Sequence, residues 1–423
     1  MYYDQRFTAK VPDHLENSGY RDLVKAILTT YGLKPSAMFV SLNRNPEREY
    51  NTFIWKVPLK RPALPSCFEH SRPYTTKPPP AGVWSVIVRI FNPKAFSVVN
   101  ANRVQNEVAS MHLIREGLAE DGKGLEKIIP DVYAWEPAVR SRRNIGWIMM
   151  ETKPGIPGSH NYRKRGDWGR DVYIEQLAEI FRVIQNIKLP STVTKSGGLT
   201  IDSHGDIVTG KAACFGGGPW ATYTDFWLRH GGMRERLDTL LKKLDSIFSQ
   251  SVAVSWHTLI HGGLAMENVL CDPNTKKITA LLDFERACVA HPSLEFLLSF
   301  RDLGGNIADN RIPYKPMEED LIDQIVFDSF EVLTLPQKTT GVIGQTAEFW
   351  EQAMAWDRAL RDNGVTKPSM ILGIQQIRLV ARITASLWPQ RLKDETLTGK
   401  QRSHIIKESW EKIDTCLRFL GIP

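Results

Sequence analysis

The stretch LIHGGLAMENVLCDPNTKKITALLDFE, residues Leu259–Glu285, carries the most specific pattern in this chain of 423 residues. An apolar approach ends at His261, a loop follows, and Asn268 stands seven residues after the histidine. The runs NVLCD and ITALL enclose a polar turn, which predicts a hairpin of two short strands, and the triplet DFE then begins at Asp283. A helix-capping turn would explain the loop by itself, but it would explain neither the hairpin nor the acidic triplet.

The residues before this stretch predict a small β-rich region. A short helical segment is expected near Asp22–Tyr31. The Pro-rich stretch Lys60–Ala81 is expected to be a surface insertion, because proline cannot join the interior of a sheet. Five further runs read as strands, namely residues 37–42, 51–59, 83–91, 131–135 and 147–151.

One amphipathic helix is predicted over Val98–Leu118, where apolar residues recur at helical spacing. Its apolar stripe consists of Val104, Val108, Met111, Ile114 and Leu118. Glu107 lies on the same face, and a carboxylate in that position needs a cationic partner. The helix is therefore expected to pack on the sheet with Glu107 paired to a basic side chain.

The segment KPGIPG follows the last of these strands. A run of strands with one helix, closed by such a Pro/Gly break, predicts a domain boundary near residue 152. From Gly166 onward the pattern is mostly helical, apart from a hairpin-like segment at residues 196–220. The predicted organisation is a β-rich N-terminal lobe, 1–152, and a helical C-terminal lobe, 153–423.

The loop, hairpin and triplet resemble the aminoglycoside phosphotransferase and choline kinase-like family, whose members show HGDLxxxN followed by a hairpin and D-[WF]-E. The resemblance implies an α+β, protein-kinase-like two-lobed fold, with a small antiparallel β lobe carrying one helix and a larger helical lobe. It also implies ATP and Mg²⁺ as cofactors. By resemblance, Asn268 and Asp283 supply the hard oxygen ligands for Mg²⁺, and His261 organises the loop.

The resemblance extends upstream of the loop, over roughly residues 35 to 300 in all. Arg89 stands where the family has a basic residue on its third strand, and Glu107 matches the helix glutamate that pairs with it, so that together they would hold the α- and β-phosphates. An ordinary strand-to-helix salt bridge is the alternative. Main-chain groups at Met150, Glu151 and Lys153 match the hinge that would face an adenine.

Three departures from the family pattern concern phosphate chemistry. Gly263 replaces the aspartate that accepts the substrate proton, and loss of a general base costs about 10²- to 10⁴-fold in rate. The turn NRNPEREYN has no glycine to bring amides close to phosphates, and its Glu47 and Glu49 would repel them. Arg89 replaces a lysine, and a planar guanidinium is not equivalent to a point charge.

Other acidic residues are candidates for the missing role. Glu267 precedes the metal-ligand asparagine and Glu285 follows the metal-ligand aspartate by two residues, so either could bind a substrate cation or hydroxyl. Both are equally well explained as solvated or loop-bracing carboxylates. The string SHGDI at 203–207 looks like the missing HGDL, but Lys211 stands seven residues after His204, so a hairpin turn is predicted there.

The carboxy-terminal region, residues 318–423, is predicted to form amphipathic helices. It corresponds to the part of the family that walls the acceptor-substrate pocket. Its tryptophans are Trp350, Trp356, Trp388 and Trp410. Such side chains either line a pocket for an apolar or planar ligand or pack between helices, which is their commoner use.

Composition and charge limit the classes of partner that the protein is expected to bind. The formal net charge is +7, but no run of five or six basic residues exists, so nucleic-acid binding is not expected. No stretch approaches the 18 apolar residues of a membrane span, and no apolar leader segment begins the sequence. Five cysteines without a CxxC pair fit a reducing compartment, so a cytoplasmic protein with a small-molecule partner is expected.

Three functions remain open. The favoured hypothesis is a repurposed cleft that binds a small molecule and catalyses a step other than phosphoryl transfer, such as a cyclisation, isomerisation or elimination in specialised metabolism. It is motivated by the lost base and the glycine-free turn. An active ATP- and Mg²⁺-dependent phosphotransferase acting on a small-molecule hydroxyl is the alternative, because both metal ligands are kept. A regulatory pseudokinase with a protein partner is the third.

Overall fold

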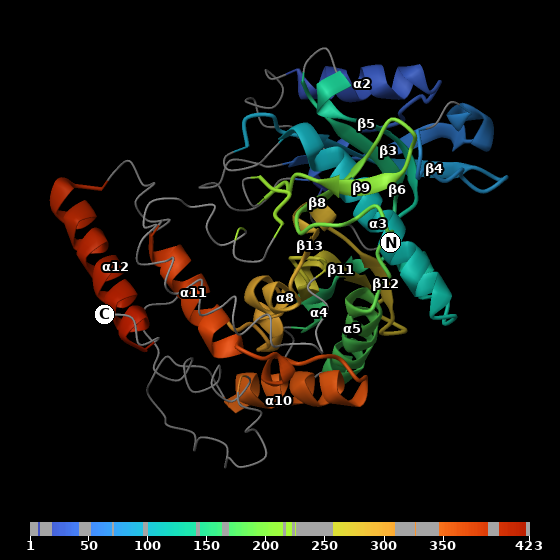
Figure 1. Cartoon of the computed structure of the whole chain (residues 1–423). Helices are drawn as coiled ribbons and strands as arrows, with labels where there is room; N and C mark the ends of the chain where they lie inside the picture. The colour runs from blue at the N-terminus through green and yellow to red at the C-terminus, as the bar shows by residue number, and fades with distance from the viewer. Residues whose placement is uncertain are drawn as a thin grey trace. The chain divides into compact units, whose positions relative to one another are not determined.

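The computed structural model describes residues 7–8, 19–41, 52–69, 72–95, 100–140, 144–162, 169–214, 217–221, 225, 257–308, 326, 347–387 and 397–419. The chain divides into two compact units. Unit 1 consists of Met1–Gly169, Ile187–Pro219 and Met266–Val289, and unit 2 consists of Arg170–Asn186, Trp220–Ala265 and Ala290–Pro423. The fold is α+β, with an antiparallel sheet toward the N-terminus and helices toward the C-terminus (Figure 1). The lobe boundary expected near residue 152 stays a prediction.

The main sheet of unit 1 is antiparallel, with the strand order β1-β2-β3-β4-β6-β5 over the residues that the structure describes. Its strands are β1 (Phe7–Thr8), β2 (Phe39–Ser41), β3 (Thr52–Ala63), β4 (Val83–Phe91), β5 (Val132–Glu136) and β6 (Trp147–Glu151). The five strands predicted from sequence are confirmed, and β4 and β6 have the expected bounds. β-Branched and aromatic residues fill these strands because such side chains pack well on a pleated surface.

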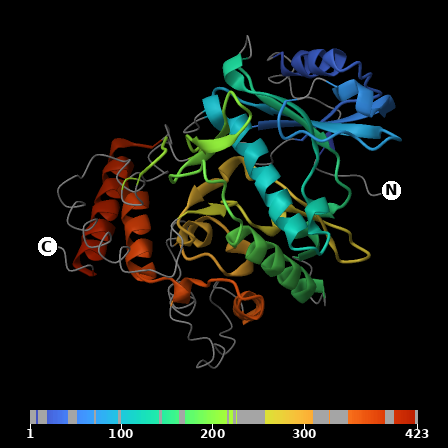
Figure 2. The ribbon, with the colours of Figure 1, turned by 45° about the vertical axis from the view of Figure 1, so that its right-hand side comes forward.

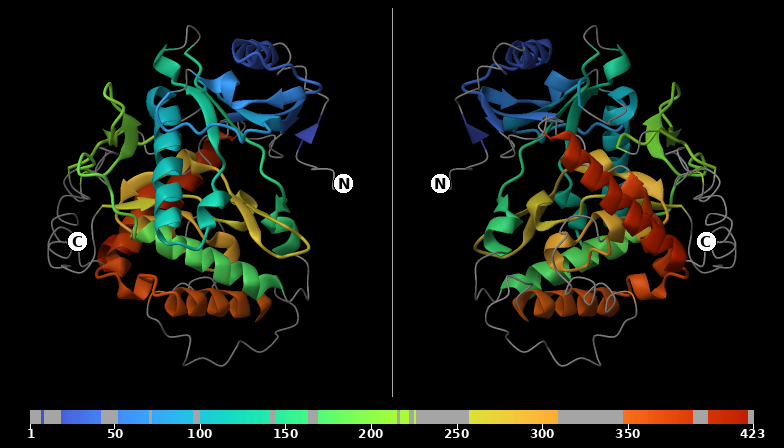
Figure 3. Two further views of the ribbon diagram at one scale, coloured as in Figure 1. Left: turned by 90° about the vertical axis from the view of Figure 1, so that its right-hand side faces the viewer. Right: turned by 90° about the vertical axis from the view of Figure 1, so that its left-hand side faces the viewer.

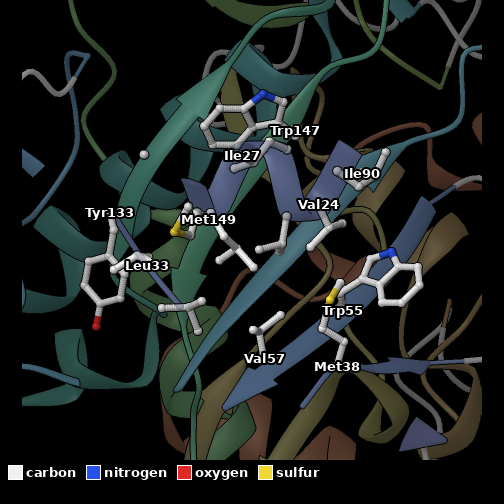
Figure 4. Close-up of a cluster of buried hydrophobic side chains, with 14 of the residues drawn as sticks. Val24, Ile27, Leu33, Met38, Trp55, Val57, Ile90, Tyr133, Trp147 and Met149 are labelled. Atoms are coloured by element: carbon white, nitrogen blue, oxygen red, sulfur yellow. The ribbon is translucent and has the colours of Figure 1, made fainter. Parts of the chain in front are cut away.

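Side chains alternate between the two faces of the sheet, as the strand geometry requires. One face of β3 and β4 is apolar and packs on Val24, Ile27 and Leu28 of helix α2 (Tyr20–Thr30), in the core drawn in Figure 4. Arg89 lies on β4 between Val88 and Ile90, both of which belong to this core. The alternation therefore directs Arg89 to the opposite face of the sheet.

The Pro-rich stretch joins the sheet further than expected. β3 continues through Pro62 to Ala63, which pairs with Val83, and its register shifts between Pro58 and Ala63. A bulge of this kind lets a strand contain prolines, because the proline nitrogens need no ladder partner there. Phe68 is fully buried, so the segment expected to be a surface insertion also contributes to the core.

The predicted helix is α3 (Arg103–Glu120), which follows a short 3₁₀ turn, Asn100–Asn102. The expected apolar stripe is buried, but polar residues on other sides of the helix are buried as well, among them Asn106 and Ser110. The reason is that the hairpin of β8 (Gly198–Ile201) and β9 (Ile207–Gly210) covers a second side of α3 (Figure 2). A single buried stripe was therefore an incomplete prediction.

A smaller antiparallel sheet of unit 1 has the order β12-β11-β7. Its strands are β7 (Ile156–Pro157), β11 (Val269–Cys271) and β12 (Ile278–Leu281), with helix α4 (Gly158–Tyr162) and the 3₁₀ turns Met266–Asn268 and Phe284–Arg286 beside them. β11 and β12 form the hairpin predicted from the runs NVLCD and ITALL. The hairpin places the DFE triplet just after the end of β12, with one residue between them.

Unit 2 is mainly helical in its described part. Its elements are α5 (Gly169–Gln185, of which Gly169 belongs to unit 1), β10 (Thr258–Ile260), α8 (Ser293–Leu298), α10 (Ala347–Asp362), α11 (Ile374–Leu387) and α12 (Gly399–Phe419); β13 (Cys288–Ala290) spans the division between the units. α11 and α12 pack against each other (Figure 3). None of the helices within the described ranges is long and apolar enough to cross a membrane.

Two of the four carboxy-terminal tryptophans belong to the core of unit 2. Trp350 and Trp356 are buried on α10, and the ring centroids of Trp356 and Phe300 are 4.8 Å apart. Trp410 on α12 is exposed, and Trp388 lies outside the described residues. Both α10 tryptophans are therefore buried in unit 2, and Trp356 also lines a small pocket with Phe296 and Leu360.

Candidate functional site

A buried group of charged side chains lies where β4 meets α3 in unit 1. Arg89 Nη1 donates to Glu107 Oε1 at 2.7 Å, which confirms the cationic partner expected for Glu107. Arg89 Nη2 donates to Asp283 Oδ1 at 2.8 Å and to Glu285 Oε2 at 3.0 Å. The side chains of Arg89, Glu107 and Glu285 are 6%, 1% and 8% exposed, so the pairs of Arg89 with the two glutamates are shielded from water.

A second arginine belongs to the same group. Arg103 Nη2 donates to Glu285 Oε1, and Arg103 Nη1 donates to the carbonyl oxygen of Asn92 at 3.1 Å. Phe91 lies beneath both guanidinium groups, with its ring centroid 5.4 Å from Arg89 Cζ and 4.9 Å from Arg103 Cζ. Cations over an aromatic face are favourably placed. Sequence reasoning missed Arg103, although it precedes Glu107 by four residues and therefore shares its helix face.

Burial controls the protonation of this group. Burial raises the pKa of Glu107, Arg89 counteracts this, and the carboxylates of Asp283 and Glu285 raise it further, to about 7. For Arg89, burial lowers the pKa, but the surrounding carboxylates outweigh this effect and raise it above its ordinary value. Arg89 is therefore a permanent cation, and burial makes ionisation of Glu107 costly.

Asp283 and Asn268 lie at the same end of the β11–β12 hairpin. Asn268 immediately precedes β11, and its carbonyl oxygen accepts a hydrogen bond from the amide of Leu282 at 2.9 Å. Asp283 directly follows Leu282 and has left-handed backbone angles, φ 67° and ψ 62°. Its side chain is 47% exposed, so its carboxylate reaches solvent while it contacts Arg89.

These two residues offer the oxygen donors that Mg²⁺ prefers. Two buried polar atoms beside them have no hydrogen-bond partner within the described part of the chain, Arg89 Nε and Glu107 Oε2. A phosphate oxygen would satisfy the arginine donor, and such orphaned atoms are costly unless a ligand or water meets them. Among the described residues, no group of three or more His, Cys, Asp or Glu side chains forms a metal cluster. The residues thus fit a metal held jointly with a phosphate better than a metal held by protein alone.

Glu285 and Glu267, the two other acidic candidates, differ in their surroundings. Glu285 is buried and bound by both Arg89 and Arg103. This geometry agrees with the loop-bracing alternative and leaves Glu285 poorly placed to meet a substrate. Glu267 is exposed in the 3₁₀ turn before β11.

The predicted hinge residues lie at the end of β6. Met150 is paired with Ile87 of β4, and the amide of Glu151 donates to the carbonyl oxygen of Asp131 at 2.8 Å. Lys153 Nζ lies 2.7 Å from Glu151 Oε2. The side chains of Glu151 and Lys153 therefore hold each other, and an adenine contact by this segment stays a prediction.

The loop of His261 and Gly263 belongs to unit 2, where α8 and the residues that follow it hold its backbone. Glu295 accepts the amide of His261 at 2.6 Å and that of Gly262 at 3.0 Å. Ser299 Oγ accepts the amide of Leu264 at 2.9 Å. Burial raises the pKa of Glu295, while its hydrogen bonds to Ser299 and to the two amides lower it, for a result of about 6. Glu295 was missed from sequence because it lies 34 residues beyond His261 and matches no motif.

Two other predicted features are the turn at SHGDI and the glycine-free turn at residues 43–51. His204 lies in the turn of the β8–β9 hairpin, where Asp202 Oδ1 accepts its amide at 2.8 Å, so the predicted hairpin turn is confirmed. The glycine-free turn, including Glu47 and Glu49, lies outside the described residues.

The profile of the phosphotransferase enzyme family matches residues 76–314, more than half of the chain. The chain belongs to this family. The match includes both α3 and the β11–β12 hairpin, so it contains every residue of the charged group. No curated protein sequence matches the chain.

Three solved structures that are similar to the chain illustrate the comparison. The ADP-bound aminoglycoside phosphotransferase APH(2'')-Ib has 12% identity and a TM-score of 0.40, with 95% of this chain and 98% of the other covered. The choline kinase LicA from Streptococcus pneumoniae has 10% identity and a TM-score of 0.39, with 94% and 99% covered. An ethanolamine kinase from Plasmodium vivax has 12% identity and a TM-score of 0.38, with 90% and 82% covered.

Proposed function

We propose that this member of the phosphotransferase enzyme family binds ATP with Mg²⁺ in unit 1 and transfers the γ-phosphoryl group slowly to a hydroxyl of a small molecule. The observation that carries the proposal is the ion pair of Arg89 with Glu107, joined through Arg89 to Asp283. Phosphoryl transfer in kinase-like folds needs this basic residue, its helix glutamate and the metal-binding aspartate in place together.

Charge supports the same proposal. The carboxylates of Asp283 and Glu285 balance the two arginines, and Glu107, with a pKa of about 7, adds negative charge as it ionises, which favours a divalent cation. Arg89 Nε, buried and without a hydrogen-bond partner among the described residues, is a donor for a phosphate oxygen. When bound, Mg²⁺ would neutralise charge on the phosphates. Arg89 and Asp283 would orient the nucleotide and its metal, and Asn268 would add an amide oxygen.

The slow rate follows from Gly263. Glycine accepts no proton from the acceptor hydroxyl, and a general base contributes about 10²- to 10⁴-fold. The transition state of phosphoryl transfer is loose and depends mainly on positioning and charge. We therefore expect a family member that keeps the charged group of unit 1 but lacks the catalytic-loop base to be a slow transferase. This reverses the preference drawn from sequence alone, where the lesions outweighed the retained residues.

A repurposed cleft with a different reaction is the second candidate, and the glycine at position 263 together with the glycine-free turn 43–51 favours it. In that case the small molecule would undergo cyclisation, isomerisation or elimination without nucleotide. Calorimetry of the full chain with ATP separates the candidates. The proposal expects binding in the micromolar range that requires Mg²⁺, whereas absence of binding would exclude it.

A matched pair of variants tests the metal role. Asp283→Asn should abolish the Mg²⁺ dependence of ATP binding. Asp272→Asn is the control, because Asp272 belongs to the same hairpin but caps its turn, where its carboxylate accepts the amide of Asn274 at 2.8 Å. Equal effects of both substitutions would contradict the assignment of Asp283.

The acceptor is tested by transfer of labelled γ-phosphate from ATP. Aminoglycosides, choline and ethanolamine form the first panel, since structurally similar proteins carry the names of kinases for these compounds. Label in a small-molecule hydroxyl supports the transferase. Nucleotide binding without transfer to any hydroxyl compound or to water would leave only the non-catalytic alternative.

A further inference from the structure

Two side chains of α3 hold the turn that carries Asp283. Arg103 binds the carboxylate of Glu285, and Asn106 Nδ2 donates to the carbonyl oxygen of Ala287 at 2.8 Å. We infer that Arg103 and Asn106 are positioning residues that fix Asp283 in its metal-binding position, an inference that rests on the proposed function. Neither residue is placed to touch a substrate, because both act on the turn and not on its exposed carboxylate.

The spacing and burial of Arg103 and Asn106 explain how the two side chains can act together. Asn106 and Glu107 stand three and four residues after Arg103, so each is a neighbour of Arg103 on the surface of α3. The Arg103 side chain has no exposed surface and Asn106 is fully buried. In such surroundings a hydrogen bond meets no competition from water, and substitution of Asn106 would take this donor from the buried carbonyl oxygen of Ala287. The turn is therefore fixed at two points, Glu285 and Ala287.

The conformation of Asp283 makes such fixing necessary. Its left-handed backbone, φ 67° and ψ 62°, is uncommon for a residue other than glycine and persists only where the surroundings impose it. On one side the amide of Leu282 donates to the carbonyl oxygen of Asn268 at 2.9 Å. On the other side the contacts from α3 begin two residues later. Asp283 therefore lies between anchored positions, and loss of the α3 contacts would release its backbone toward ordinary angles.

Asn102 is a matched reference for Asn106. Both are buried asparagines near the start of α3, and both bind the backbone of Leu199 in the β8–β9 hairpin. Asn106 Oδ1 accepts the amide of Leu199 at 2.7 Å, and Asn102 Nδ2 donates to its carbonyl oxygen at 2.9 Å. Asn102 also donates to the carbonyl oxygen of Lys211 at 2.7 Å, whereas Asn106 donates to Ala287. Both alanine variants lose a contact with the β8–β9 hairpin, but only Asn106→Ala loses the contact with Ala287. A difference between the two variants therefore reports on the turn at residues 283–287.

Hydrogen exchange in the full chain tests the inference without nucleotide. The amide of Ala287 donates to the carbonyl oxygen of Phe284 at 3.0 Å, so its exchange rate reports on the turn. Asn106→Ala should speed exchange in residues 283–287 at least tenfold relative to Asn102→Ala. Equal exchange in both variants would overturn the inference. This measurement decides the point even if the wild-type chain fails to bind ATP, which would defeat only the proposed function.

Nucleotide binding provides the readout that a merely structural role would not move. We expect Asn106→Ala to raise about tenfold the Mg²⁺ concentration needed for half-maximal ADP binding, with metal-free ADP affinity within twofold of wild type. Asn102→Ala should change neither value. A parallel loss of metal-free and metal-dependent binding in Asn106→Ala would overturn the positioning role.

Arg103 is tested in the same assays. Arg103→Met leaves the buried Glu285 carboxylate with Arg89 as its remaining arginine, so the variant risks unfolding. The double variant Arg103→Met, Glu285→Gln removes the pair without leaving that charge. It should reproduce both the faster exchange and the raised Mg²⁺ requirement, and wild-type values in this double variant would exclude Arg103 from the role.

Discussion

The backbone at Gly263 is compatible with an aspartate. Gly262 has φ 72°, in the left-handed region, whereas Gly263 is not among the described residues with positive φ. Glu295 and Ser299 hold the amides on both sides of Gly263, so the loop keeps its shape without a side chain at this position. Under the proposed function, Gly263→Asp should raise the rate of phosphoryl transfer by about 10²-fold or more, because it supplies a general base.

Steady-state transfer of labelled phosphate measures this effect. The neighbouring substitution Gly262→Asp is the control, since it adds the same charge one residue away at a position where a side chain is strained. It should not raise the rate. An unchanged rate in Gly263→Asp would show that the missing base does not limit the reaction.

Glu295 makes the stability of the chain depend on pH. Its pKa is about 6 in the folded chain and 4.5 when unperturbed, with burial as the main cause. Between these pH values the folded state binds more protons than the unfolded state, so the contribution of Glu295 to the free energy of unfolding is greatest below pH 4.5 and is lost as the pH rises through 6. At about 1.4 kcal/mol per unit, the loss is on the order of 1 to 2 kcal/mol.

Urea unfolding of the wild type and of Glu295→Gln, at pH 4.5 and at pH 7, measures this contribution. The stability advantage of the wild type over the variant should be larger at pH 4.5 by the stated amount. The buried His291 also titrates, since burial lowers its pKa to about 3, but it is common to both proteins and cancels in the difference. A constant advantage, or one that grows with pH, would contradict the prediction.

Among the elements, α3 shows what periodicity can and cannot predict. The apolar residues from Val104 to Leu118 correctly identified a helix that packs on the sheet. They could not identify the second covered side, because it is made of polar residues whose partners come from the distant β8–β9 hairpin. From the sequence alone, a buried asparagine cannot be distinguished from a solvent-facing one, because its backbone partners are not known.

The β8–β9 hairpin lies so close to its neighbours that a methyl group is excluded at Gly198. A Cβ there would overlap the carbonyl group of Lys211 and would lie 2.8 Å from Asn106 Oδ1. Gly198→Ala should therefore lower the free energy of unfolding by about 1 to 3 kcal/mol, the usual cost of overpacking. Urea denaturation measures the change. Gly399→Ala is the control and should be neutral or slightly stabilising, because an added Cβ there meets no described atom within 4 Å beyond its chain neighbours and its own helix.

For the molecule as a whole, local signals predicted local structure. The hairpin of β11 and β12, the strands β4 and β6, and the pairing of Arg89 with Glu107 all follow from residues near each other in sequence. The pairing of Arg103 with Glu285 joins residues 182 positions apart and has no sequence signature. The sequence therefore predicts the motif residues of the site, but it does not predict the side chains that hold those residues in place.

The order of segments in the two units predicts how the chain folds. Unit 1 takes Met1–Gly169 but also needs Ile187–Pro219 and Met266–Val289, which supply the hairpin covering α3 and the partners of Arg89 and Arg103. A fragment 1–169 lacks Glu285, the buried carboxylate that binds Arg103, and a buried pair broken in this way costs about 3 to 5 kcal/mol. That loss is comparable to the whole stability of a small domain.

We therefore expect fragments 1–152 and 1–169 to lack a cooperative thermal transition by circular dichroism, while the full chain shows one. A chimera that links residues 1–169, 187–219 and 266–289 through flexible Gly/Ser linkers is the control, since it keeps the elements of unit 1 and should recover a transition. Cooperative unfolding of fragment 1–152 at the temperature of the full chain would contradict this dependence. It would instead support the lobe boundary near residue 152 that the KPGIPG segment predicts.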